Sequence, residues 1–176
     1  TPENIGDTIR LSGWVHRKRD HGGVVFIDLR DHYGLTQCVV DSTDAAFPAV
    51  ETVRNESVIT ITGTVRARSE ETVNTSLPTG GIEVHIDELV LQSAADTLPI
   101  QVNSDEDSGE DIRLRYRYLD LRLQRPHVII MLRSRIIQSI RQRMIAQDFT
   151  EFQTPMLTAS SPEGARDFLV PDRMHP

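Results

Sequence analysis

Apolar and polar residues alternate in five short segments within the first 91 residues, and this pattern limits that part of the chain to β structure. An apolar residue at every second position places one side of a strand in a core and the other side toward solvent. Residues 44–54 differ, because their apolar residues recur every three positions and predict a short helix. The predicted strands cover residues 9–16, 24–30, 35–41, 57–66 and 82–91.

The order of these elements is three strands, one helix and two strands. This is the order of the five-stranded Greek-key OB barrel, which binds oligonucleotides or sugars on one face and on two of its loops. We therefore expect an OB-fold domain over residues 1–92. A different small barrel with the same order of elements stays open at this point.

The charge of the chain does not by itself indicate a nucleic-acid-binding protein. Asp and Glu number 26 against 19 Lys and Arg, which gives a formal net charge of −7. Any nucleic acid must then be held by local basic groups and by contacts to bases. The main basic cluster of the first half is Arg17-Lys18-Arg19, although three basic neighbours are also typical of an ordinary solvated surface.

Several residues of the predicted barrel have the chemistry needed to recognise bases. Phe26 must point outward if its neighbours in the alternation point inward, and an outward aromatic ring on this face stacks on a base. Glu83 is also outward and can accept from a base amino or imino group. Gln37 can donate and accept, but its strand is apolar on both sides, so its facing is open. Arg19 and Arg68 can contact phosphates or bases. Each residue alone also fits an ordinary surface.

Other classes of protein are excluded or not indicated. No apolar run approaches the roughly 20 residues of a membrane span, and no signal peptide is recognisable. Cys38 is the single cysteine, which excludes an internal disulfide or a cysteine-cluster zinc site and favours a reducing compartment. No spacing of ligand residues predicts a bound metal. Because the sequence runs from Thr1 to Pro176 and stops within a motif, we expect a longer protein.

The remaining residues predict a linker and the beginning of a second domain. Residues 104–111 are charged and contain no apolar residue, as in a linker. The run RLRYRYLDLR at 113–122 fits either a segment packed between domains or a contact to RNA phosphates. Pro126 is expected at the first position of a helix of about 22 residues. Residues 149–157 predict a strand that is interrupted by a proline.

Six runs of sequence, in this order, resemble bacterial aspartyl-tRNA synthetase, a class II aminoacyl-tRNA synthetase. The resemblance implies an anticodon-binding OB barrel over 1–92, a hinge over 93–120, and the start of an antiparallel-sheet catalytic domain over 121–176. The runs are GWVHRKRDHGG (13–23), FIDLRD (26–31), TGTVRAR (62–68), RLRYRYLDLR (113–122), FTEFQTPMLT (149–158) and SSPEGARDFLVP (160–171).

The resemblance also implies an activity for the intact protein. Such an enzyme makes aspartyl-adenylate from aspartate and ATP with Mg²⁺, and then transfers the aspartate to tRNA in the cytoplasm. Glu163 matches the residue that faces the ammonium group of aspartate, and Pro155 lies in the motif that forms the homodimer interface. The two motifs that clamp ATP are absent from this sequence, so it holds no catalytic residue. We expect the 176 residues alone to be inactive.

For the barrel, the resemblance implies anticodon contacts by Arg19, Phe26, Gln37 and Glu83, with Arg68 as a further RNA contact. His21 resembles a subgroup that charges tRNAs for both aspartate and asparagine. That subgroup often has a small residue near the position of Glu71, so relaxed specificity is a hypothesis. Asp148 replaces a glycine of the family after the long helix, and we expect it to adopt the same left-handed conformation.

Two other functions fit parts of the sequence. One is a non-catalytic tRNA-binding OB-fold module whose C-terminal part only forms a dimer. The other is an interaction barrel that binds no nucleic acid. The sequence that follows Pro176 separates the first of these from a ligase, and a tRNA-binding measurement tests the second.

Overall fold

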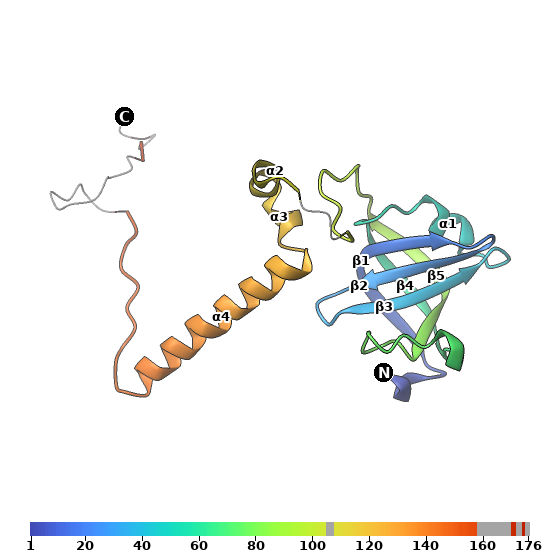
Figure 1. Cartoon of the computed structure of the whole chain (residues 1–176), viewed down its shortest axis with the longest axis horizontal. Helices are drawn as coiled ribbons and strands as arrows, with labels where there is room; N and C mark the ends of the chain where they lie inside the picture. The colour runs from blue at the N-terminus through green and yellow to red at the C-terminus, as the bar shows by residue number, and fades with distance from the viewer. Residues whose placement is uncertain (105–107, 158–169, 172–173, 175–176) are drawn as a thin grey trace. The chain divides into compact units, whose positions relative to one another are not determined.

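The computed structural model describes residues 1–104, 108–157, 170–171 and 174 (Figure 1). The chain forms two compact units, Thr1–His127 and Val128–Pro176. Among the described residues, the first unit contains a β-barrel, three short α-helices and the first turn of a long helix, and the second contains the rest of that helix. The domain boundaries expected at residues 92 and 120 stay a prediction.

The barrel closes in the strand order β1-β2-β3-β5-β4. All neighbouring strands are antiparallel except β3 and β5, which run parallel. This is the OB topology, so the fold predicted from the order of elements is confirmed. The elements of the barrel are η1 (Pro2–Asn4), β1 (Thr8–Asp20), β2 (Val24–Arg30), β3 (Leu35–Asp41), α1 (Phe47–Thr52), β4 (Val58–Ala67), η2 (Glu70–Thr72) and β5 (Ile82–Ser93).

Strand β1 closes the barrel because it pairs with two different neighbours. Its first half pairs with β4 and its second half with β2, so that Trp14 is in register with both Val58 and Arg30. The adjacent Gly13 has no side chain, and a Cβ there would collide with the backbone carbonyl of Arg30. A glycine at this position therefore permits the close approach of the two strands.

The barrel core consists of the residues that the alternation placed inward. On β2, Val25, Ile27 and Leu29 are at most 3% exposed, and β4 and β5 bury their own inward sets. Burial of this apolar area is the main favourable contribution to barrel stability. The core residues are Val15, Val25, Ile27, Leu29, Cys38, Val40, Ala46, Val50, Val53, Ile59, Ile61, Val65, Ile82, Val84 and Ile86.

A second, smaller core lies in the segment expected to be a linker. Ile100, Val102 and Leu119 are buried against one another, and the segment forms helices α2 (Glu110–Arg115) and α3 (Arg117–Asp120). Asp120 is fully buried and accepts hydrogen bonds from the guanidinium groups of Arg113 and Arg117. The packed residues lie on both sides of the charged run 104–111 that predicted a linker.

Helix α4 (Gln124–Ile145) has the 22 residues expected, but it begins two residues earlier than predicted. Pro126 is its third residue, which is tolerated because the first four backbone N–H groups of a helix have no partner within the helix. Asp148 follows the helix with φ of 65°, as expected. Residues 149–157 form no strand, contrary to the prediction, since none of the described residues supplies them with a partner strand.

Candidate nucleic-acid interface

The outward face of β1, β2, β3 and β5 gathers most of the residues that the sequence singled out. Phe26 lies on the side of β2 opposite to the core and is half-buried. It is in register with Arg19 on β1 and with Val39 on β3. A half-buried ring in this position leaves part of its apolar surface open to a ligand.

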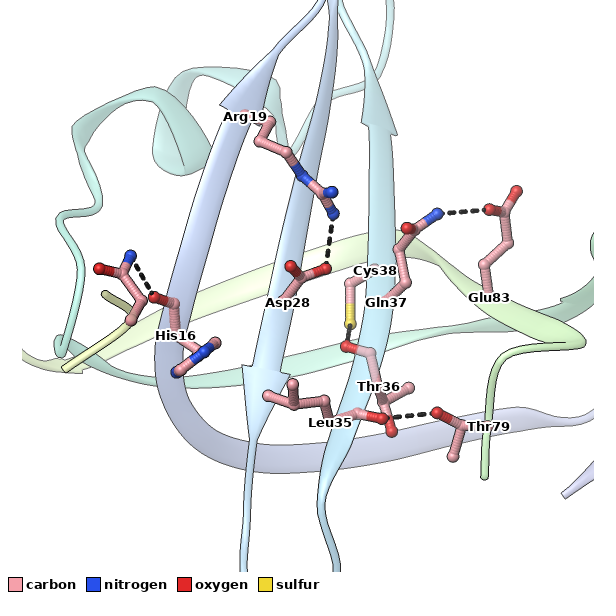
Figure 2. A network of polar contacts seen from close by, with 10 residues as sticks. His16, Arg19, Asp28, Leu35, Thr36, Gln37, Cys38, Thr79 and Glu83 are labelled. Carbon is pink, nitrogen blue, oxygen red and sulfur yellow. Dashed lines mark hydrogen bonds and ion pairs between the residues drawn. The ribbon is translucent and has the colours of Figure 1, made fainter. Parts of the chain in front are cut away.

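Arg19 is held on this face by an ion pair. Its Nη2 donates to Asp28 Oδ1 over 2.7 Å, as Figure 2 shows. The Arg19 side chain is 39% exposed and that of Asp28 is 16% exposed. The pair neutralises the charge of the guanidinium and limits its rotamers, so Arg19 is a fixed hydrogen-bond donor rather than a free cation.

Gln37 and Glu83 form a second polar pair on the same face. Gln37 Nε2 donates to Glu83 Oε2 over 3.0 Å (Figure 2). The open question of where Gln37 points is thus resolved: it is in register with Asp28 and shares the side of β3 that faces away from the core. The parallel pairing of β3 with β5 brings Gln37 beside Glu83, and together they present both a donor and an acceptor for base edges.

The basic cluster at residues 17–19 does not act as one patch. Arg17 donates to the backbone oxygen of Asn103, and Lys18 donates to the carbonyls of Val50 and Glu51 at the end of α1. Burial lowers the pKa of Lys18 below its ordinary value. Only Arg19 reaches the candidate face, because the other two side chains bind backbone carbonyls elsewhere.

His21 lies at the edge of this face, in the turn between β1 and β2. Its ring approaches Phe26 edge-on, with centroids 5.5 Å apart and planes 80° apart. Gly22 and Gly23 have φ of 70° and 108°, and the Asp20 carboxylate accepts from both of their backbone N–H groups. The glycines therefore let the chain turn tightly and leave the His21 ring exposed beside the aromatic position.

Arg68 follows the end of β4 and lies two residues beyond Arg66. Its backbone N–H donates to the carbonyl of Gly81, and its Nε is buried without a hydrogen-bond partner among the described residues. Arg66 is exposed and is in register with Glu83. No hydrogen bond found among the described residues links Arg68 to the two polar pairs.

Sequence reasoning missed two residues of this face, Asp28 and Arg66. Asp28 lies in the same alternation that placed Phe26 outward, so this signal was present but was not used. Arg66 lies beside Glu83 only through the register of β4 with β5, which no local pattern specifies. With them, each of the two carboxylates on this face has an arginine neighbour, Asp28 with Arg19 and Glu83 with Arg66.

The second unit carries a different feature, an apolar groove at the end of α4. Its volume is about 440 Å³. Pro155 is exposed in the same unit, and Glu163 lies outside the described residues. The groove is lined by Ile137, Ile140, Arg141, Met144, Ile145, Phe149, Thr150 and Glu151.

Two protein families match adjoining parts of the chain. Residues 9–91 match the family described as OB-fold nucleic acid binding domain. Residues 109–176 match tRNA synthetases class II (D, K and N). The chain is also 62% identical, over 99% of its length, to an aspartate–tRNA(Asp/Asn) ligase of Erythrobacter litoralis. The chain is similar over nearly its whole length to ligases of this name. The resemblance seen in the six sequence runs is thus confirmed.

The chain spans less than a third of these relatives. It covers 29% of the Erythrobacter protein, and 20% of a ligase with the same name from Paramagnetospirillum magneticum, to which it is 63% identical. Among solved structures, it resembles asparaginyl-tRNA synthetase from Pyrococcus horikoshii with a TM-score of 0.77 and 27% identity, covering 93% of this chain and 37% of that one. Aspartyl tRNA synthetase from Entamoeba histolytica shares the fold, with a TM-score of 0.79 and 22% identity over 93% of this chain and 39% of that one.

None of the described helices is both long and apolar enough to cross a bilayer. Among the described residues, no group of three or more His, Cys, Asp or Glu side chains is placed to hold a metal ion.

Proposed function

We propose that this chain is the anticodon-recognising part of an aspartate–tRNA ligase, together with the beginning of its catalytic domain. The observation that carries the proposal is the outward barrel face, where Phe26 lies beside Arg19 and shares one side of the strands with the Arg19–Asp28 and Gln37–Glu83 pairs. The 62% identity to a ligase named for tRNA(Asp/Asn) supports the same function.

The chemistry of each residue on the face suits it to a different contact with the RNA. Phe26 stacks on an unpaired base, and Arg19 donates to a base or a phosphate beside it. Gln37 and Glu83 contact the edge of a neighbouring base, where the carboxylate accepts from an amino or imino group. Arg68 supplies a phosphate contact from the end of β4. Because Arg19 is paired and Glu83 is anionic, the face favours bases over phosphates.

A stem–loop titration tests this proposal directly. The anticodon stem–loop of tRNA for aspartate is titrated into the wild-type chain and into a Phe26→Ala variant. Loss of the stacked base should weaken binding by about 5- to 150-fold, or ~1–3 kcal/mol. Tyr33→Ala is the matched control, because Tyr33 is an aromatic residue that is 84% exposed on the β2–β3 loop. Equal affinities of wild type and Phe26→Ala would refute the proposal.

We further propose that the intact enzyme charges tRNAs for both aspartate and asparagine. The names of these relatives include both tRNAs. The His21 ring lies edge-on to Phe26, next to the position where the proposed base would stack. In the full-length enzyme, His21→Leu should shift the ratio of the two charging efficiencies roughly tenfold toward aspartate tRNA. His32→Leu, on the exposed β2–β3 loop, is the control. An unchanged ratio would argue against this role of His21.

The catalytic half of the proposal concerns the intact protein. ATP and Mg²⁺ serve as its substrate and cofactor, and Glu163 binds the ammonium group of aspartate by a charge-assisted hydrogen bond. The cytoplasm is the compartment where such a bacterial ligase works. The chain spans less than a third of the ligases it resembles, and we expect the 176 residues alone to show no aspartate-dependent pyrophosphate exchange.

We propose a homodimer as the functional state. The groove at the end of α4 has an apolar floor that includes Ile140, Met144 and Phe149, and a second copy of the chain would cover it. Pro155 lies in the extended segment that follows, where a proline suits an interface without a continuous ladder.

A further inference from the structure

The only tryptophan of the chain, Trp14, lies beneath two arginines from distant parts of the first unit. The guanidinium carbon of Arg30 is 6.0 Å from the indole centroid, and that of Arg122 is 5.3 Å away. Trp14 and Arg30 are neighbours across β1 and β2, whereas Arg122 comes from the segment just before α4. Both distances are within the range of cation–π attraction.

Glu56 binds the two arginines together. Its Oε2 accepts from Arg30 Nη2 over 2.9 Å and from Arg122 Nη1 over 2.6 Å. Arg30 Nη1 also lies 2.8 Å from Oε1. The Glu56 side chain is 3% exposed, and a carboxylate buried to this extent needs cationic partners. The backbone of Glu56 is anchored as well, since its N–H donates to the carbonyl of Val15.

The segment that carries Arg122 has further ties to the barrel. Asn103 Nδ2 donates to the carbonyl of His16 over 3.0 Å, and Arg17 donates to the carbonyl of Asn103 over 3.1 Å. The N–H of Ala95 donates to Ser57 Oγ. With the small core around Leu119, these contacts make residues 98–104 and 108–123 an ordered extension of the barrel rather than a free tether.

We call the cluster of Trp14, Arg30, Glu56 and Arg122 the clamp. The clamp and the candidate RNA face share one side of β2. Phe26, Asp28 and Arg30 occupy successive outward positions of this strand, so one end of the row carries the proposed stacking residue and the other end holds Glu56. We propose that Trp14, Arg30, Glu56 and Arg122 form a positioning device that fixes residues 98–104 and 108–123 on the barrel and couples RNA binding to the chain entering α4. The coupling rests on the proposed function, whereas the clamp itself does not.

The first test measures the clamp without RNA. Trp14 is the sole tryptophan, so its quenching by neutral acrylamide reports on the cover that Arg122 provides. Arg122→Gln should increase quenching and raise proteolytic nicking within residues 93–123 roughly tenfold, as expected on losing a charge-assisted hydrogen bond. Arg125→Gln is the control, because it removes the same charge from an exposed position three residues away. If both variants behave like wild type, the clamp is refuted.

The second test measures the coupling in the full-length enzyme. Arg122→Gln should leave stem–loop affinity and pyrophosphate exchange within about twofold, and lower kcat/KM for whole tRNA roughly tenfold. Arg122→Lys keeps the charge but not the planar group, so it should restore only part of this loss. Release of the segment with unchanged aminoacylation would overturn the positioning role. If the wild type fails to bind the stem–loop, the proposed function fails, and the acrylamide result still decides whether the clamp exists.

Discussion

The barrel and helix α4 contain apolar residues with equally clear periodicity, yet the two regions bury them to very different extents. In the barrel, Ile27, Ile59 and Ile61 are fully buried by neighbouring strands of the same chain. On α4, Ile136 and Ile140 are 50% and 59% exposed. A period in the sequence shows which side of an element is apolar, but it does not show what covers that side. In the closed barrel, neighbouring strands bury the apolar side of each strand, whereas a single helix cannot bury its own apolar side.

The largest expected effect is a loss of stability on replacing isoleucine by alanine in the barrel. The same substitution on α4 should have little effect. Ile61→Ala should destabilise the barrel by ~2–5 kcal/mol, because it removes buried methyl groups and leaves a cavity. Ile140→Ala should leave the barrel unchanged and should not reduce helix content, since alanine favours helices more than isoleucine does. Denaturant unfolding followed by Trp14 emission measures the first effect, and circular dichroism measures the second. Equal losses from both variants would contradict the comparison.

A smaller effect is expected at the end of α4. Asp148 has φ of 65°, a conformation that glycine adopts without the steric cost of a Cβ. Asp148→Gly should therefore stabilise the helix end by about 0.5–1 kcal/mol, and Asp148→Ala should weaken it. The measurement is amide exchange of Phe149, whose N–H donates to the carbonyl of Met144 over 3.2 Å. Faster exchange in the glycine variant would disprove this account of the helix end.

The smallest effect concerns pH and belongs to the barrel. Burial and then the charge of Arg30 lower the pKa of His16 below its ordinary value of 6.5. Arg30 Nη1 lies 3.0 Å from His16 Nδ1, and because a guanidinium only donates, this nitrogen must accept and stay unprotonated. The unfolded chain then binds a proton more readily, so His16 contributes stability above about pH 6.5 that is lost as the pH falls through the folded-state pKa.

Unfolding midpoints measured between pH 7.5 and 5 test this sign. His16→Gln should flatten the decrease in stability on acidification, whereas His32→Gln on the exposed β2–β3 loop should retain it. A steeper decrease in the His16 variant would show that protonation of this ring stabilises the fold.

Much of the barrel was predictable because a strand alternates over adjacent residues. The phase of β2 placed Phe26 outward and Ile27 inward, and the positions of the turns gave the bounds of β2 and β3 to the residue. The end of α4 was predictable for a similar reason, since the conformation of Asp148 depends on a local steric preference. Residues 149–157 were not predictable in this way, because a strand exists only where another strand accepts its hydrogen bonds.

The sequence by itself determined the order of strands along the chain, the inward and outward residues and the long helix. These follow from apolar residues that recur every two positions in the strands and every three or four positions in the helix. Only the tertiary structure decided which outward residues meet. Gln37 reaches Glu83 across 46 positions, and Arg122 reaches Glu56 across 66. The tertiary structure also decides the partners of three consecutive basic residues. Arg17 binds Asn103, Lys18 binds the end of α1, and Arg19 binds Asp28. The physical reason is barrel closure, which sets the register between non-consecutive strands and depends on packing of the whole core rather than on any local pattern.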